Sequence, residues 1–369
     1  MDFAFLHTKP FKKFKSQKPY LELKDKVKEI AIYKGGGGLG DLAVGVPFFK
    51  MIREAFPDSK IYYMGIIYPR FEKIFKAIPY FDGYIHFERP DKGKGIRKFL
   101  RFRKEWKGKI DLLIDTQRRW ETSFWLRCLN PKYMLSASAF LSDWPMPGLH
   151  YKKMHILEQL ISLPARLGIQ DFDLTGTKLS LPQESQCKAE KFLSGFSQSK
   201  FIAMFPGCGM DFKNWLPEYF AKLGDLFAEK GYNVLLLGSP KNIELLRAVS
   251  QKMRYPSILP LEINKNLTTE ILDEAAILEY CKAVIGNDSG SLHLASCLGI
   301  LSAAIFGPTT PRKFSPIGPR SIIFYKNLPC SPCRFQCSRT INRECLSAIT
   351  PEEVFLKVSQ YLEENNIAK

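Results

Sequence analysis

The sequence predicts an α/β fold built from two doubly wound domains that face a cleft. The chain has 369 residues, which is long enough for two domains. Each half alternates short apolar runs with amphipathic stretches, a pattern typical of parallel sheets covered by helices on both faces. Several apolar runs end in glycine-rich turns, and ligands of doubly wound folds bind at the carboxyl ends of the strands.

The first half contains four expected strands, at residues 28–33, 60–65, 84–87 and 110–115. The expected helices between them lie at residues 42–55, 71–77 and 120–128. The first of these helices is amphipathic, because Val46, Phe49 and Ile52 fall on one side of it.

The second half repeats this plan, with expected strands at residues 201–205, 233–237, 283–285 and 301–306. Its expected helices lie at residues 217–230, 242–252, 268–281 and 289–298. Thr350-Pro351-Glu352-Glu353 has the sequence of a capping box with proline at the first helical position, so we expect a last helix to about residue 363.

Four segments are predicted from this organisation. Residues 1–27 form a basic N-terminal extension, residues 28–180 a first domain, residues 181–350 a second domain and residues 351–369 a C-terminal helix. We place the boundary between the two domains within the polar, proline-containing stretch at residues 173–199.

The composition is that of an ordinary globular protein, with 45% hydrophobic and 25% charged residues. No apolar run approaches 18 residues, so no membrane span is expected. The N-terminus lacks the order of a secretory signal, which favours a cytoplasmic location. Nine cysteines, an odd number, do not suit a secreted disulfide framework.

The formal net charge of +17 predicts an anionic partner. Basic residues concentrate at residues 9–18 and 92–109, and the second stretch interleaves them with apolar residues at helical spacing. Such a helix suits an anionic membrane surface, or it is a solvated helix whose apolar face packs on the core. The chain has no recognisable nucleic-acid-binding motif, so nucleic acid is not an expected partner.

The most informative segment runs through Gly286-Asn287-Asp288-Ser289-Gly290-Ser291 between a buried strand and a helix. The first N–H groups of a helix have no partner within it and lie at the positive end of its dipole, where phosphates bind. The Asp288 carboxylate would repel phosphate, but it could accept hydrogen bonds from sugar hydroxyls. This combination favours a nucleotide sugar.

The glycine loop at residues 35–40 contains a formal G-x-G-x-x-G, the dinucleotide fingerprint. The strand at residues 60–65 does not end in the acidic residue that would hold a ribose, and Asp41 would repel a pyrophosphate. A dinucleotide-dependent dehydrogenase is therefore disfavoured. Asp41 is either a helix cap or a general base, because bare glycine backbone lets a substrate approach closely.

A third segment runs from Pro206 to Pro217 and also joins a strand to a helix. Lys213 lies within it, as a mobile positive charge able to neutralise a leaving diphosphate or as an ordinary solvated lysine.

These three segments, in this order, resemble the lipopolysaccharide heptosyltransferases of glycosyltransferase family 9. The matching motifs are Gly40-Asp41, Pro206-Gly207 through Lys213-Asn214-Trp215-Leu216-Pro217, Gly286 to Ala295, Phe306-Gly307-Pro308-Thr309 and Cys330 to Cys333. The resemblance implies two Rossmann-like domains of GT-B type. It also implies inverting transfer of heptose from ADP-heptose to the inner core of lipopolysaccharide, without a catalytic metal, at the inner face of the cytoplasmic membrane.

The resemblance also assigns residues. Asp41, beside Gly40 on the acceptor side, would be the base, and Lys213 would be the phosphate partner. Separately from the resemblance, Arg118, Arg119 and the basic stretch at residues 92–109 are candidates for binding the phosphates of the acceptor. The donor side would comprise Gly207, Cys208, Lys213, Glu244, Asp288, Ser289, Gly290, Ser291 and His293. His293 can equally be read as a core histidine. Cys208-Gly209-Met210 departs from the small hydroxyl residues that relatives more often carry there.

Four late cysteines, Cys330, Cys333, Cys337 and Cys345, have the spacing C-x2-C-x3-C-x7-C. Four thiolates can hold a structural zinc or iron ion, whereas free thiols or a disulfide are the alternatives.

Two other functions remain open at this point. One is transfer of another nucleotide sugar to a lipid or protein, and the other is a nucleotide-binding module without catalysis. The presence of Asp41 together with Lys213 and Asp288 argues against the second, because a binding module needs no base.

Overall fold

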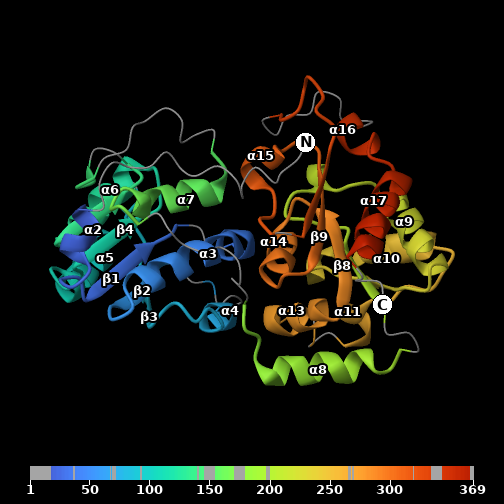
Figure 1. Ribbon diagram of the computed structural model, residues 1–369, viewed down its shortest axis with the longest axis horizontal. Coiled ribbons are helices and arrows are strands. Elements are labelled where there is room, and N and C mark those ends of the chain that lie inside the picture. The colour runs from blue at the N-terminus through green and yellow to red at the C-terminus, as the bar shows by residue number, and fades with distance from the viewer. Residues whose placement is uncertain are drawn as a thin grey trace. The chain divides into compact units, whose positions relative to one another are not determined.

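A computed structural model describes residues 18–35, 38–66, 68, 72–91, 94–138, 141–144, 154–169, 179–196, 200–264, 267, 270–318, 320–333 and 343–365 (Figure 1). The chain divides into two compact units. The first comprises Met1–Gly37, Gly45–Tyr68 and Pro79–Thr177, and the second comprises Gly38–Val44, Pro69–Ile78 and Lys178–Lys369.

The first unit is built on a parallel sheet of five strands in the order β3-β2-β1-β4-β5. The strands are β1 (Glu29–Tyr33), β2 (Lys60–Gly65), β3 (Gly83–His86), β4 (Leu112–Asp115) and β5 (Tyr133–Ser136). Their side chains are largely buried because helices cover both faces of the sheet. The fifth strand was not predicted, since its four residues carry too little pattern to be distinguished from a loop.

The helices of this unit are α2 (Lys18–Leu23), α3 (Leu39–Ala55), α5 (Ile96–Trp106), α6 (Trp120–Arg127) and α7 (Ile156–Ala165). Helix α3 begins three residues before its predicted start, so its first turn contains Gly40 and Asp41. Helices α5 and α6 share one core cluster with the sheet, where Phe99 and Leu126 pack over Ala31 and Leu113.

The second unit has another parallel sheet of five strands, in the order β10-β9-β8-β6-β7. These are β6 (Phe201–Phe205), β7 (Asn233–Leu236), β8 (Cys281–Asn287), β9 (Leu301–Phe306) and β10 (Ser321–Tyr325). The helix predicted at residues 268–281 was wrong at its end. Helix α13 (Ile271–Glu279) ends earlier, and Cys281 already pairs with Phe201 in the sheet.

The other helices of the second unit are α4 (Glu72–Lys76), α8 (Gln183–Leu193), α9 (Pro217–Glu229), α10 (Ile243–Lys252), α11 (Pro260–Ile263), α14 (Gly290–Cys297), α15 (Pro311–Phe314), α16 (Glu344–Ser347) and α17 (Pro351–Glu364). Only half of the expected capping box forms at α17. The Thr350 hydroxyl accepts from Glu353 N at 3.2 Å, while the Glu353 carboxylate contacts Lys326 Nζ at 2.8 Å. Among the described helices, none has the length and apolar character needed to cross a bilayer.

Candidate active site

Both sheets have a point at which the strand order reverses, and the predicted site residues follow the strands beside it. This point lies between β1 and β4 in the first unit and between β6 and β8 in the second. Strands on either side of such a point connect in opposite directions, which leaves a crevice at their carboxyl ends. The segments that follow these four strands carry Asp41, Arg118, Lys213 and Asp288, with Asp41 in the first turn of α3.

Lys213 and Asp288 form an ion pair, with Lys213 Nζ 2.8 Å from Asp288 Oδ2. The side chains are only 17% and 9% exposed, so Lys213 is held in place rather than solvated. Thr309, from the loop after β9, donates its hydroxyl to the same carboxylate oxygen at 2.8 Å. This pairing places a positive charge beside Asp288 and weakens the repulsion that the carboxylate alone would exert on a phosphate.

Ser289 caps the start of α14 without using its side chain for the cap. Its hydroxyl oxygen is buried and has no hydrogen-bond partner among the described residues. A buried hydroxyl without a partner costs free energy, and a ligand that accepted or donated the missing hydrogen bond would recover it. Gly290 and Ser291 follow it in the first turn of α14, and His293, 9% exposed, lies one turn further along.

Two asparagines that sequence reasoning missed support these loops. Asn287 Oδ1 accepts from Trp215 N at 2.7 Å, and its amide donates to Pro206 O at 2.7 Å. Asn214 Oδ1 accepts from Cys208 N at 2.9 Å. Asn287 therefore ties the end of β8 to both ends of the loop that carries Lys213. In the sequence, only the position of Asn214 and Asn287 within the motifs could have indicated this supporting role.

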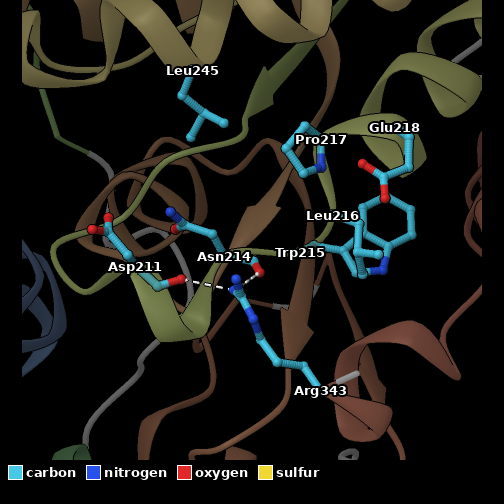
Figure 2. Close-up of a pocket in the computed structure, with 8 residues that line it drawn as sticks. All are labelled: Asp211, Asn214, Trp215, Leu216, Pro217, Glu218, Leu245 and Arg343. Atoms are coloured by element: carbon cyan, nitrogen blue, oxygen red, sulfur yellow. Dashed lines mark hydrogen bonds between the residues drawn. The ribbon is translucent and has the colours of Figure 1, made fainter. Parts of the chain in front are cut away.

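Arg343 holds the same loop from its other side. Its Nη1 donates to the carbonyl oxygens of Asp211 and Asn214, each at 3.0 Å (Figure 2). These residues border a pocket of about 280 Å³, lined by Asp211, Asn214, Trp215, Leu216, Pro217, Glu218, Leu245 and Arg343. The pocket is smaller than most ligand sites, so it suits part of a ligand at most.

The first turn of α3 belongs to the second unit and lies against α14. A Cβ added at Gly290 would come within 2.8 Å of Gly40 N, so two glycines permit this close approach. Ala43 lies three residues after Gly40 on α3, and its carbonyl oxygen accepts a hydrogen bond from the Cys297 thiol of α14 at 3.0 Å. That carbonyl needs an external donor because Pro47 lacks the N–H that would complete the helical bond. Asp41 is therefore carried on a turn that packs on α14.

In the first unit, the loop after β4 is held by a buried carboxylate. Asp115 accepts from Gln117 N and from the hydroxyls of Ser123 and Ser136. Burial raises the pKa of Asp115 to about 6, against the lowering effect of these hydrogen bonds. Burial also raises the pKa of Tyr33 to about 12, with the charge of Asp115 adding to the effect.

The predicted acceptor residues Arg118 and Arg119 are both exposed in this loop. Arg119 is close enough to Tyr33 for its positive charge to oppose the rise in the tyrosine pKa. Arg89, which the sequence analysis did not single out, has the same effect on Tyr33. The loop therefore presents positive charge at the carboxyl end of the first sheet.

Three other predicted donor residues have different surroundings. Gly207 lies against Asn242, whose Nδ2 would be 2.5 Å from an added Cβ. Burial raises the pKa of the Cys208 thiol, whose Sγ donates to Met210 O at 3.2 Å. Glu244, on α10, is 79% exposed and pairs with Arg247.

The predicted metal site of four cysteines includes Cys337, which lies outside the described residues. Cys330 and Cys333 are free thiols, and no three of the described histidine, cysteine or acidic side chains are grouped to hold a metal. The segment packs on the loop of Thr309, since Cys333 N donates to Pro308 O at 3.0 Å. The metal site stays a prediction.

Two doubly wound parallel sheets with polar loops at their switch points define a GT-B type of fold. Glycosyltransferase family 9 (heptosyltransferase) has a sequence profile that matches residues 99–341, and the chain belongs to this family. The lipooligosaccharide heptosyltransferase 2 of Campylobacter jejuni subsp. jejuni serotype O:2 is 24% identical over 339 residues, which cover 89% of this chain and 97% of that protein.

Solved structures share the fold. A family 9 glycosyl transferase from Veillonella parvula matches with a TM-score of 0.76 and 24% identity, over 92% of this chain and 98% of that one. The E. coli ADP-heptose LPS heptosyltransferase II matches with a TM-score of 0.70 and 17% identity, over 92% and 99%. The predicted fold class is confirmed.

Proposed function

We propose that this protein transfers heptose from ADP-heptose, with inversion, to the inner core of a lipopolysaccharide acceptor. Its family and the names of its relatives support this substrate class. The observation that carries the proposal is the cluster of Lys213, Asp288 and Thr309 beside the Ser289 hydroxyl, which has no partner in the described part of the chain. It offers a cation and a hydroxyl to a diphosphate and a carboxylate to sugar hydroxyls.

In the proposed reaction, Asp41 accepts the proton of the acceptor hydroxyl while that oxygen bonds to the anomeric carbon of heptose. The bond from this carbon to ADP breaks, and its electron pair leaves with the diphosphate. An ammonium group has three N–H donors, so Lys213 can hold Asp288 and still stabilise the departing charge. Lys213 supplies the positive charge that a metal ion would otherwise provide.

Arg118 and Arg119 are proposed to bind phosphates of the acceptor, because exposed guanidinium groups form paired hydrogen bonds with phosphate. Such an acceptor is a glycolipid, so the protein would act at the inner face of the cytoplasmic membrane as a peripheral enzyme. The basic charge of +17 supports this location.

The proposal is tested by measuring ADP release from ADP-heptose with a panel of truncated core acceptors. Asp41→Asn keeps the shape of the side chain and removes the base, so release should fall by about 10²–10⁴-fold. Asp58→Asn, at an exposed turn, is the matched control and should leave the rate unchanged. Tight ADP binding without release from any acceptor would instead favour another donor sugar or a non-catalytic module.

A further inference from the structure

Helix α5 carries positive charge that the described part of the chain does not neutralise. Arg97, Lys98, Arg101 and Lys104 are exposed, and none forms an ion pair with a described carboxylate. The first turn of α5 contains no acidic residue, and Arg97 and Lys98 stand there at the positive end of the helix dipole. A cation is unfavourable at this end, and an external anion would offset the cost.

Apolar side chains lie exposed beside these bases. Ile96 and Leu100 of α5 are 40% and 54% exposed, and Trp120 and Phe124 of α6 are 63% and 47% exposed. We call these four residues the α5–α6 apolar row. Among the described residues, eleven large hydrophobic side chains are exposed, and four of them come from these two helices. Such a concentration marks an interaction surface rather than scattered exposure.

Helices α5 and α6 are neighbours, so the row belongs to one surface. The rings of Phe99 and Trp125 are 4.8 Å apart, and Arg103 Nε donates to Cys128 O at 2.8 Å. Within each helix the exposed apolar residues are four positions apart and therefore lie one above the other. Both helices are drawn in teal in Figure 1.

The surface begins at the carboxyl edge of the first sheet. Trp120 is the first residue of α6 and lies five residues after Asp115, the last residue of β4. Ile96 is the first residue of α5, the helix that follows β3. The loop with Arg118 and Arg119 lies at this same edge. The apolar row therefore adjoins the positive loop to which the acceptor phosphates were assigned.

We propose that the α5–α6 apolar row and the bases of α5 dock on an anionic phospholipid bilayer. The inference rests on the proposed function, because a glycolipid acceptor is anchored in such a bilayer and its sugar must reach the carboxyl edge of the sheet. Apolar side chains inserted at the headgroup boundary, with basic residues beside them, are the two contributions that bind interfacial helices. A purely apolar protein partner would leave the four cations without counter-charges.

The test is flotation of the full chain with vesicles of phosphatidylethanolamine and phosphatidylglycerol, without donor or acceptor. Wild type should bind them, bind phosphatidylcholine vesicles weakly, and dissociate as salt is raised. Replacing Lys98 and Lys104 with Gln should weaken binding by about 30-fold, at roughly fivefold for each basic residue. Ile96→Ser together with Leu100→Ser should weaken vesicle binding by roughly 100-fold, because two apolar side chains that would be buried in the bilayer are lost.

Matched controls remove the same groups from the second unit. Lys230→Gln with Lys252→Gln removes two exposed lysines, and Ile263→Ser with Leu356→Ser removes two side chains that are 60% and 66% exposed. Both control variants should bind vesicles like wild type. Equal losses in the controls, or no binding by wild type at low salt, would overturn the proposal.

Two further measurements separate this inference from the proposed function. With a lipid-embedded acceptor the α5 variants should lose rate, whereas with a soluble truncated acceptor they should keep the wild-type rate. If no acceptor supports transfer but vesicle binding still depends on the row, the docking surface stands and the proposed function fails. Conversion of a dimer to a monomer by the Ile96 and Leu100 changes, seen in sedimentation, would assign the row to a second copy and overturn lipid docking.

Discussion

At the scale of single residues, the carboxylate of Asp288 receives two hydrogen bonds whose donors come from separate loops. Lys213 brings a charge from the loop after β6, and Thr309 brings a hydroxyl from the loop after β9. The motif containing Thr309 was recognised in the sequence, but no role was given to its hydroxyl. Its role became visible only when β8 and β9 placed their carboxyl ends side by side.

Replacing Thr309 with Val should lower kcat/KM for the donor by about tenfold or more, because a hydrogen bond to a charged group is lost. Thr309→Ser keeps the hydroxyl and should retain most of the activity. Initial rates at varied donor concentration would measure both variants. A Val variant as active as wild type would show that Lys213 alone orients Asp288.

At the scale of elements, the approach of α3 to α14 depends on two glycines. Neither Gly40 nor Gly290 has a side chain to separate the two first turns, and Pro47 frees the Ala43 carbonyl for the Cys297 thiol. Burial raises the pKa of Cys297 to about 12, which keeps the thiol protonated and able to donate. Asp41 is thereby positioned by packing between helices far apart in the sequence.

Replacing Gly290 with Ala should lower kcat by roughly 100-fold, because a Cβ there would push the turn that carries Asp41 out of place. Gly195→Ala is a suitable control, since its added Cβ would make only an ordinary contact at 3.6 Å. Single-turnover rates at saturating donor would separate this effect from weaker binding. Unchanged kcat in the Gly290 variant would mean that the close approach is not needed for catalysis.

At the scale of the whole molecule, buried carboxyls make folding stability depend on pH, and Glu274 has the larger rise in pKa of the two among the described residues, Asp115 and Glu274. Glu274 of α13 is 8% exposed, and burial raises its pKa to about 7 from an ordinary value of 4.5. The folded protein therefore holds this proton at pH values where the unfolded chain has released it. Its contribution to stability is fullest below about 4.5 and is lost as the pH rises towards 7.

Glu274→Gln should therefore stabilise the protein by about 3 kcal/mol at pH 8 and by very little at pH 4.5. Urea unfolding at the two pH values, compared with an exposed Glu22→Gln control, measures the difference. Equal effects at both pH values would show that the Glu274 carboxyl does not titrate in this range.

Much of this protein could be predicted from its sequence because the determining patterns are local. Apolar runs between turn residues located β2, β6 and β9 at their observed bounds, and alternation of strands with helices indicated two parallel sheets. The motifs around Asp41, Lys213 and Asp288 gave the family, which the match over residues 99–341 confirms. The assigned roles of these residues stay predictions.

Only the tertiary structure decided which groups meet. Lys213 and Asp288 are 75 positions apart, and Cys297 and Ala43 are 254 apart, so no local pattern could indicate their pairing. The short β5 and β10 were also missed, because edge strands of four or five residues are defined by pairing with a neighbour rather than by periodicity. Local periodicity encodes the elements, whereas the packing of buried surfaces brings distant side chains into one site.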